Sequence, residues 1–256
     1  MAQKIVRTLH LRREDRVVEI GPGKGALTSL LLREVPRLHA IELDNELAGQ
    51  LNAAFGEKLI LYNEDVLNVD LRSIAGRGSG KLRIVGNIPY NITSPILFWI
   101  IDSSDVVTDC TLMMQREVAQ RLVARPRTKA YGILSIIAQY YSTPKMLFTV
   151  TPRSFSPVPD VTSAVVSLNF EMRHSPRAID DALFRVAVRG TFGKRRKTLR
   201  NGLRSLNVDA SFLGSTSIDL DRRPEELSVN EFVALANELS RQNVNISLNA
   251  TVSPHR

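Results

Sequence analysis

Short apolar runs rich in β-branched residues alternate with segments of helical periodicity along the first part of the chain. The apolar runs cover residues 17–20, 39–43, 59–62 and 82–86, and the helical patterns cover residues 2–9, 26–32 and 45–54. Strands that alternate with helices in this way are typical of a mostly parallel sheet with helices on both faces. The pattern therefore predicts an α/β, Rossmann-like fold, whose chemistry lies at the carboxyl ends of the strands.

The last part of the chain has helical periodicity only. Helices are expected over residues 182–191, 198–206 and 229–239, with Ser228 as the cap of the last one. Pro176 and the polar residues 173–175 come before them and indicate a linker. We therefore expect a first domain over residues 1–172, a small all-helical domain over residues 177–241, and a disordered tail over residues 242–256.

The composition is typical of a soluble, cytoplasmic protein. Of the 256 residues 43% are hydrophobic, and the single cysteine, Cys110, excludes an intramolecular disulfide. The four histidines have no metal-ligand spacing, so no metal site is expected. The N-terminus lacks the long apolar core of a signal peptide, and the longest apolar run, residues 96–101, is too short to cross a bilayer. No contact with a membrane is expected.

The positive charge of the chain is concentrated in one segment. The net charge is +8, and residues 182–208 contain eight basic and no acidic residues, so the remainder is neutral. A local basic excess is typical of a protein that binds nucleic acid, although a solvated helix face is the alternative. The residues expected to contact phosphates are Lys194, Arg195, Arg196, Lys197 and Arg200.

A glycine-rich turn follows the first predicted strand. Residues 21–25 read Gly-Pro-Gly-Lys-Gly, and such glycines allow the backbone to approach a nucleotide closely. Glu42 ends the second strand, 19 positions after Gly23, a spacing at which a carboxylate can accept both hydroxyls of a ribose. Gly21, Gly23 and Glu42 fit NAD as well as S-adenosylmethionine.

Residues that follow the third strand and end the fourth distinguish between these two cofactors. Asp65 follows the third strand, where a carboxylate can accept from an adenine amine. The fourth strand ends in residues 87–90, which read Asn-Ile-Pro-Tyr and which we call the tetrapeptide. The amide of Asn87 donates and accepts, Pro89 fixes the backbone and Tyr90 offers a flat face, which suits a planar ring with an exocyclic amine. An ordinary strand-to-helix turn is the alternative.

A helix start follows the tetrapeptide. Thr93 or Ser94 is expected as the cap, with Pro95 at the first helical position. The tetrapeptide is therefore predicted to stand between a buried strand and a helix.

Taken together, these motifs resemble those of the ribosomal RNA adenine dimethyltransferase family, and most closely those of its bacterial small-subunit (16S) branch. The matching stretches are residues 19–28, 41–44, 64–66, 86–92, 115–122, 130–132, 155–159, 163–166 and 195–201. Each is short, but their order and spacing together are specific. The resemblance implies a seven-stranded methyltransferase sheet, S-adenosyl-L-methionine as cofactor, and 16S rRNA in an immature small ribosomal subunit as partner of a monomeric enzyme.

The resemblance also implies roles for single residues. The implied cofactor ligands are Gly21, Gly23, Glu42, Asp65, Val66 and Asn87, with plain core packing as the alternative for Val66. The side chain of Asn87 and the carbonyl of Ile88 or Pro89 would accept the hydrogens of an adenine amine, so that its nitrogen can attack a methyl sulfonium in line. Tyr90 would stack on the base, and Phe155, unless it is a core aromatic, would cover the opposite face.

The sequence departs from the family pattern in two places. The basic segment with Gly-Gln-Asn-Phe-Leu that usually precedes the first helix is not present, so its ligands are not expected here. Thr162 stands where the family usually has Asp. The alternatives in function are a large-subunit (23S) rRNA adenine methyltransferase, a DNA adenine methyltransferase, which would typically carry Asp in place of Asn87, and a ribosome-assembly binding factor with secondary methylation.

Overall fold

The computed structural model describes residues 1–76, 80–154, 160–172, 174–193 and 197–242. Three expected features lie outside these described residues: the aromatic Phe155, the basic residues Lys194, Arg195 and Arg196, and the tail after Gln242. Within the described ranges, no helix is both long and apolar enough to cross a membrane.

The chain forms two compact units. The first joins Met1–Ala119 to Pro144–Met172, and the second joins Gln120–Thr143 to Arg173–Arg256. The sequence predicts a single boundary near residue 172, so the assignment of residues 120–143 differs from the expectation. They belong with the helical unit because the buried Tyr131 donates its hydroxyl hydrogen to the Leu227 carbonyl, at 2.8 Å.

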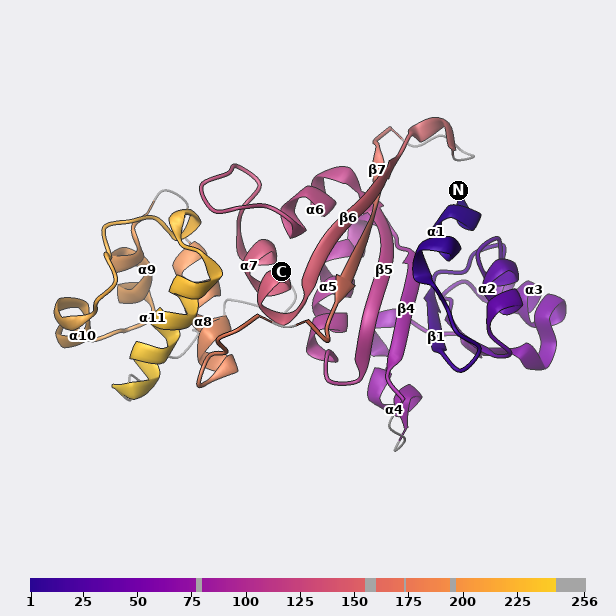
Figure 1. Ribbon diagram of the computed structural model, residues 1–256, viewed down its shortest axis with the longest axis horizontal. Coiled ribbons are helices and arrows are strands. Elements are labelled where there is room, and N and C mark those ends of the chain that lie inside the picture. Colours follow the sequence, from indigo (N-terminus) through magenta and orange to yellow (C-terminus); the bar gives the residue numbers. More distant parts are fainter. Residues whose placement is uncertain (77–79, 155–159, 173, 194–196, 243–256) are drawn as a thin grey trace. The chain divides into compact units, whose positions relative to one another are not determined.

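The first unit is built on a seven-stranded sheet of order β3-β2-β1-β4-β5-β7-β6 (Figure 1). Its strands are β1 (Arg16–Ile20), β2 (Leu38–Ile41), β3 (Leu59–Tyr62), β4 (Leu82–Asn87), β5 (Val107–Gln115), β6 (Thr143–Val150) and β7 (Ser163–Asn169). Neighbouring strands from β3 to β5 are parallel, and β7 is antiparallel to β5. The expected α/β fold with a mostly parallel seven-stranded sheet is confirmed.

Helices cover both faces of this sheet. They are α1 (Ala2–Leu9), α2 (Thr28–Glu34), α3 (Asn45–Phe55), α4 (Leu71–Ala75), α5 (Thr93–Asp102) and α6 (Arg116–Leu122), which ends in the second unit. Ile5 of α1, Leu31 of α2 and Leu51 of α3 share one buried cluster with the sheet. In Figure 1, α1, α2 and α3 lie on one side of β4 and β5, and α5 lies on the other.

The strand order reverses between β1 and β4. From β1 the chain proceeds outward to β2 and β3, and then returns to place β4 on the other side of β1, where Ile20 pairs with Gly86. In open α/β sheets, ligands bind in the crevice at the carboxyl ends of the strands where the order reverses. The loop after β1 and the end of β4 therefore define the expected binding edge.

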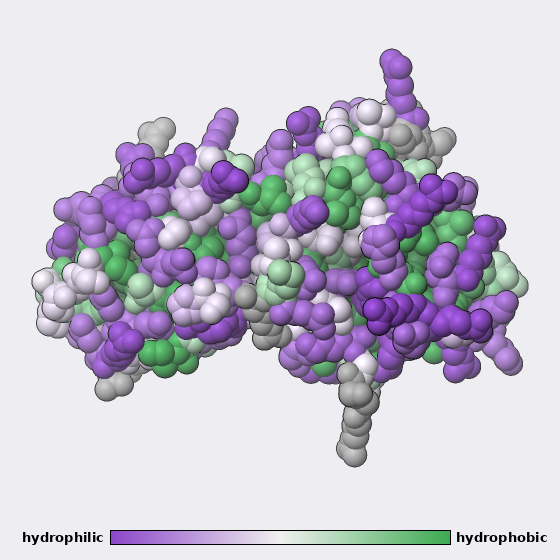
Figure 2. Space-filling model, viewed as in Figure 1, coloured by the Kyte–Doolittle hydropathy of each residue, from purple (hydrophilic) through white to green (hydrophobic). Residues whose placement is uncertain are grey.

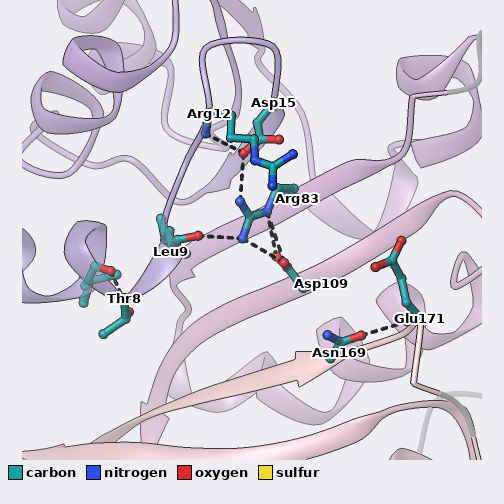
Figure 3. A network of polar contacts seen from close by, with 9 residues as sticks. Thr8, Leu9, Arg12, Asp15, Arg83, Asp109, Asn169 and Glu171 are labelled. Atoms are coloured by element: carbon teal, nitrogen blue, oxygen red, sulfur yellow. Dashed lines mark hydrogen bonds and ion pairs between the residues drawn. The ribbon is translucent and has the colours of Figure 1, made fainter.

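An ion-paired arginine joins three elements at the opposite edge of the sheet (Figure 3). Arg83 of β4 contacts Asp109 of β5 and Asp15 before β1, each at 2.8 Å. It also donates to the carbonyl of Leu9, the last residue of α1, at 2.7 Å. All three charged side chains are less than one fifth exposed, at 17–19%. We call this set the Arg83 cluster.

The second unit is helical. Its helices are α7 (Ile133–Tyr141), α8 (Asp181–Phe192), α9 (Leu199–Ser205), α10 (Ala210–Ser215) and α11 (Val229–Arg241). Three fully buried aromatic side chains, Phe184, Phe212 and Phe232, contribute to its core. The expected all-helical C-terminal region is confirmed, whereas α10 was not predicted because Gly214 and two serines weaken its helical pattern.

A reciprocal cap begins α11. Ser228 accepts from the Glu231 amide, and Glu231 accepts from the Ser228 amide at 2.8 Å, as the predicted cap requires. The guanidinium of Arg222 also donates to Glu231, and together with Ser228 it lowers the pKa of that carboxyl to about 2.

The surface is mostly hydrophilic on the face that Figure 2 shows. Among the described residues, the large apolar side chains that remain exposed are Met1, Leu43, Val161, Met172 and Ile179. Leu43 is 67% exposed and directly follows the predicted ribose ligand Glu42.

Candidate functional site

The loop after β1 and the tetrapeptide lie side by side at the carboxyl edge of the sheet. A Cβ atom built on Gly21 would lie 3.5 Å from the carbonyl oxygen of Asn87. A Cβ on Gly86 would lie 2.6 Å from the carbonyl oxygen of Ile20, so the last residues of β1 and β4 can pack this closely only with glycine there. The structure thus brings together two predicted site segments that are far apart in the sequence.

Left-handed glycines shape the loop after β1. Gly21 and Gly23 have φ angles of +64° and +57°, which other residues rarely adopt. The space around the position of a Cβ on Gly23 is open to 4 Å, so the loop leaves room above its backbone for a ligand.

Glu42 connects the second strand to this loop. Its carboxylate accepts from the amides of Gly23 and Asp44, each at 3.1 Å and each through a different oxygen. A carboxylate has about four acceptor positions, so two remain for hydroxyl donors. The predicted ribose ligand is therefore fixed in orientation and only 9% exposed, with spare acceptor capacity.

β2 ends at Ile41, and not at Leu43 as the apolar run predicts. Glu42 and Leu43 are held as loop residues, because Asn63 donates its side-chain amide to the Glu42 carbonyl at 2.9 Å. Leu43, the next residue along the chain, is exposed to solvent. The apolar run over residues 39–43 predicts Leu43 as a strand residue, so its exposure in a loop differs from the expectation.

Asp65 and Val66 follow β3. Asp65 is half-buried and accepts from the Leu67 amide at 2.9 Å through one oxygen, which caps a short 3-10 helix over Val66–Asn68. Its other oxygen has no hydrogen-bond partner within the described part of the chain. The side chain of Val66 is only 8% exposed.

Asn87 lies exposed at the carboxyl edge of the sheet, and the next residue, Ile88, is buried. Asn87 is the exposed last residue of β4, and its side chain makes no hydrogen bond to any residue that the structure describes. Ile88 is 1% exposed and donates its amide to the Met113 carbonyl of β5 at 3.2 Å. The anchored Ile88 therefore fixes the backbone from which the Asn87 side chain projects.

Pro89 is exposed, and its carbonyl oxygen is already occupied. It accepts from the Ile92 amide at 3.3 Å and from the Thr93 hydroxyl at 3.2 Å. Thr93 is thus the first residue of α5 and not its cap, and the expected start at Pro95 is wrong by two residues. The two predicted backbone acceptors differ, since the carbonyl of Ile88 accepts no hydrogen bond from the described residues.

Tyr90 is half-buried, and its hydroxyl lies 2.5 Å from the hydroxyl of Ser163. Ser163 is the fully buried first residue of β7. Sequence reasoning had Ser163 only as part of a family motif, because its proximity to Tyr90 depends on how β7 inserts beside β5.

A buried carboxyl lies below the glycine loop. Glu19 of β1 is 1% exposed and accepts from the Thr28 hydroxyl at 2.7 Å. Burial raises the pKa of Glu19 to about 7, with a smaller contribution from the negative charge of Glu42. Glu19 is not among the predicted site residues, although an acidic residue inside the apolar run of residues 17–20 is a signal for such a buried group.

Only part of the expected phosphate-binding set is described. Lys197 is exposed, and Arg200 on α9 is half-buried. The guanidinium of Arg200 pairs with Asp221 at 3.2 Å and donates to the Leu213 carbonyl at 3.3 Å. Arg200 is therefore held by its own unit, whereas Lys197 extends into solvent.

A hollow of about 280 Å³ lies beyond Asp65, lined by Tyr62, Glu64 and residues 68–70 and 73–74. None of the expected cofactor ligands lines it. The expected ligands lie along the open carboxyl edge of the sheet.

The fold and this edge define a class of protein, the Rossmann-like methyltransferases. Two solved structures have the same fold along nearly the whole chain. A dimethyladenosine transferase from Plasmodium falciparum has a TM-score of 0.77 at 22% identity, covering 96% of this chain and 97% of that one. The 23S rRNA methyltransferase ErmE has a TM-score of 0.66 at 23% identity, covering 93% and 96%.

The sequence comparisons identify the family. The family model described as ribosomal RNA adenine dimethylase matches residues 1–241, and the chain belongs to this family. Relatives named ribosomal RNA small subunit methyltransferase A include one from Alcanivorax borkumensis, 42% identical over 93% of this chain and 84% of its own length. Another, from Burkholderia mallei, is 44% identical over 91% of this chain and 86% of its own length.

The residues present fit the cofactor of this family, S-adenosyl-L-methionine. Its methionine part carries charged groups that need close backbone approach, which the left-handed Gly21 and Gly23 provide. Its ribose hydroxyls need acceptors, and Glu42 has two acceptor positions to spare.

Proposed function

We propose that this protein dimethylates the exocyclic amine of adenines in 16S rRNA, with S-adenosyl-L-methionine as methyl donor. It acts in the cytoplasm as a monomer on immature small ribosomal subunits. Membership in the ribosomal RNA adenine dimethylase family supports the reaction, and the names of the relatives support the small-subunit substrate. The observation that carries the proposal is the unpaired amide of the rim residue Asn87 beside the loop of Gly21.

In this proposal the residues that would hold the cofactor lie along the carboxyl edge from β3 to β4. Gly21 and Gly23 approach its methionine part, Glu42 accepts from the ribose hydroxyls, and Asp65 accepts from the adenine amine through its free oxygen. The bound cofactor supplies an electrophilic methyl group on a sulfonium. Leu43, because it is exposed beside Glu42, contacts one face of the adenine, and Val66 flanks the ring from its largely buried position.

The target adenine is held by the tetrapeptide. The side-chain oxygen of Asn87 and the carbonyl of Ile88 accept the two amine hydrogens, which favours a pyramidal nitrogen with its lone pair directed at the methyl group. Of the two backbone acceptors, Ile88 is favoured because the Pro89 carbonyl already accepts two internal hydrogen bonds. The proton leaves afterwards from the methylated ammonium, so no strong base is needed.

Tyr90 supplies the face on which the target base stacks, worth about 1–3 kcal/mol by analogy with single-strand binders. A base inside a duplex cannot reach this edge, so the target is unpaired or flipped out. Phe155 covers the opposite face of the base, and Lys194, Arg195, Arg196, Lys197 and Arg200 contact rRNA phosphates. The role of Phe155 rests on the family resemblance, and the roles of the basic residues rest on the concentration of positive charge in residues 182–208.

The test is methyl transfer from labelled S-adenosyl-L-methionine to immature small subunits, with large subunits offered in parallel. Asn87→Ala should lower the transfer rate by about 100-fold, since one preorganised polar contact at the reacting atom is lost. Asn91→Ala is the matched control, because Asn91 is an exposed asparagine of the short 3-10 helix that follows Pro89. It should transfer at the wild-type rate.

Other outcomes separate the alternatives. Transfer to large subunits alone would support a 23S enzyme. Binding of small subunits without transfer by any variant would support an assembly factor. Normal transfer by Asn87→Ala would contradict the proposed role of the amide.

A further inference from the structure

The tetrapeptide is attached to the sheet at three points. Asn87 is paired with Met113 as part of β4, and the Ile88 amide donates to the Met113 carbonyl at 3.2 Å. The third point is the contact of 2.5 Å between the hydroxyls of Tyr90 and Ser163. Because β5 lies between β4 and β7, this contact links the tetrapeptide across one strand of the sheet.

Ser163 is a rigid partner for this contact. It is 0% exposed and pairs with Gln115, the last residue of β5. The carbonyl of the preceding Thr162 accepts from the Arg116 amide at 2.9 Å, which fixes the entry into β7. A hydroxyl on such a buried strand end has little freedom to move away from its partner.

Tyr90 is less constrained by packing. It is only half-buried, in a short 3-10 helix over Tyr90–Ile92. A separation of 2.5 Å is at the short end of the range for O–H···O hydrogen bonds. With its hydroxyl tied and its backbone held by Ile88, the ring keeps one orientation relative to Asn87.

We infer that Ser163 is a positioning residue: its buried hydroxyl holds the phenol of Tyr90 and thereby sets the plane on which the target adenine lies. The inference rests on the proposed function. Ser163 acts on the reaction through Tyr90, because the angle of the base relative to Asn87 decides whether the amine meets the methyl group in line. It should affect the turnover rate much more than the affinity for the cofactor.

Two variants test the same hydrogen bond from its two ends. Ser163→Ala removes the hydroxyl of the strand, and Tyr90→Phe removes the hydroxyl of the ring while keeping its stacking face. Each should lower kcat for methyl transfer by about tenfold, with the cofactor Kd unchanged. The double variant should transfer no more slowly than the slower single variant, because both changes break one contact.

The matched control is Ser167→Ala. Ser167 lies on β7, on the same side of the strand as Ser163 but four residues from the carboxyl edge, and it is half-buried. It should transfer at the wild-type rate. If Ser163→Ala unfolds, Tyr90→Phe still tests the contact, since it removes a single oxygen from a half-buried ring.

A second measurement reports the contact independently of activity. The ζ-carbon resonance of Tyr90, observed with labelled tyrosine, should shift in Ser163→Ala and not in Ser167→Ala. An unshifted resonance in Ser163→Ala would overturn the inference. So would normal kcat in both single variants beside an active wild type, or losses that add up in the double variant. An inactive wild type would instead overturn the proposed function, and this role of Ser163 with it.

Discussion

The buried carboxyl of Glu19 makes stability depend on pH. Its pKa is about 7 in the folded chain, against 4.5 for an ordinary glutamate, so the folded state binds more protons than the unfolded state between these values. Stability that is present below pH 4.5 is therefore lost as the pH rises through 7. A shift of this size corresponds to roughly 3 kcal/mol.

Glu19→Gln should remove this dependence, because a glutamine stays neutral and can still accept from the Thr28 hydroxyl. We expect the variant to be more stable than the wild type at pH 8 and nearly equal to it at pH 5. Urea unfolding at the two values measures this, with the exposed Glu57→Gln as control. Parallel pH profiles for wild type and Glu19→Gln would show that Glu19 does not titrate as described.

Leu43 should matter for the cofactor and not for folding. Its side chain is 67% exposed, so Leu43→Ser removes little packing in the free protein. In the proposed complex the side chain is covered by adenine, and its loss should weaken binding of S-adenosyl-L-methionine by roughly tenfold. Calorimetric titration gives the Kd, and a thermal melt checks that Tm is unchanged.

A control for this prediction is Ile179→Ser, which changes an equally exposed aliphatic residue of the helical unit, at 62%. Both variants should melt like the wild type, and only Leu43→Ser should bind the cofactor less tightly. Equal affinity in the two would exclude a contact between Leu43 and the adenine.

At the scale of elements, the Arg83 cluster should contribute far more to stability than an exposed ion pair. Arg83→Met leaves Asp109 buried without its cation, which typically costs about 3 kcal/mol or more. Arg72→Met breaks an exposed pair with Asp105, whose side chains are 50% and 57% exposed, and should cost under about 1 kcal/mol. Urea unfolding of the two variants measures the difference.

The loss of stability in Arg83→Met, which we call its deficit, should also depend on pH. Burial raises the pKa of Asp109 even with Arg83 beside it, and removing the guanidinium raises it further. Protonation of Asp109 then relieves the unpaired charge, so the deficit should be smaller at pH 5 than at pH 7.5. Equal deficits at both values would mean that Asp109 is not the group left unpaired.

The elements around the site could be predicted because each is encoded locally. The apolar runs and the glycines located β1 to β4, and the Ser228 cap located α11. The predicted start of α5 is two residues late. Thr93 is not the cap but the first residue of the helix, and its hydroxyl donates to the Pro89 carbonyl of the preceding turn. Local patterns give element types more surely than their ends.

What could not be predicted depends on contacts between distant segments. The link from Tyr90 to Ser163 spans 73 positions, and it exists only because β7 inserts antiparallel beside β5. The Arg83 cluster likewise joins α1, β4 and β5. The loop that exposes Leu43 is contacted by Asn63, which follows the next strand and donates to the Glu42 carbonyl. No periodicity in the sequence records such pairings.

At the scale of the whole molecule, the chain separates its tasks between two units. The first carries the carboxyl edge with Gly21, Glu42 and Asn87. The second carries the basic segment in which the net charge of +8 resides. Residues 120–143 join the second unit although the sheet continues after them, so the chain passes between the units twice before β7 and once after it.

The two described members of the basic set should contribute unequally to RNA binding. Lys197 is exposed and can pair with a phosphate, which releases a counterion, whereas the guanidinium of Arg200 is held by Asp221 and the Leu213 carbonyl. Lys197→Ala should therefore reduce the slope of log Kd against log salt concentration by about 0.7–0.9. Arg200→Ala should change it by less than half as much. Binding of a 16S rRNA fragment at a series of salt concentrations measures both slopes, with Lys58→Ala, directly before β3, as an exposed control. If Arg200→Ala lowers the slope as much as Lys197→Ala, Arg200 must exchange its carboxylate partner for phosphate when the RNA arrives.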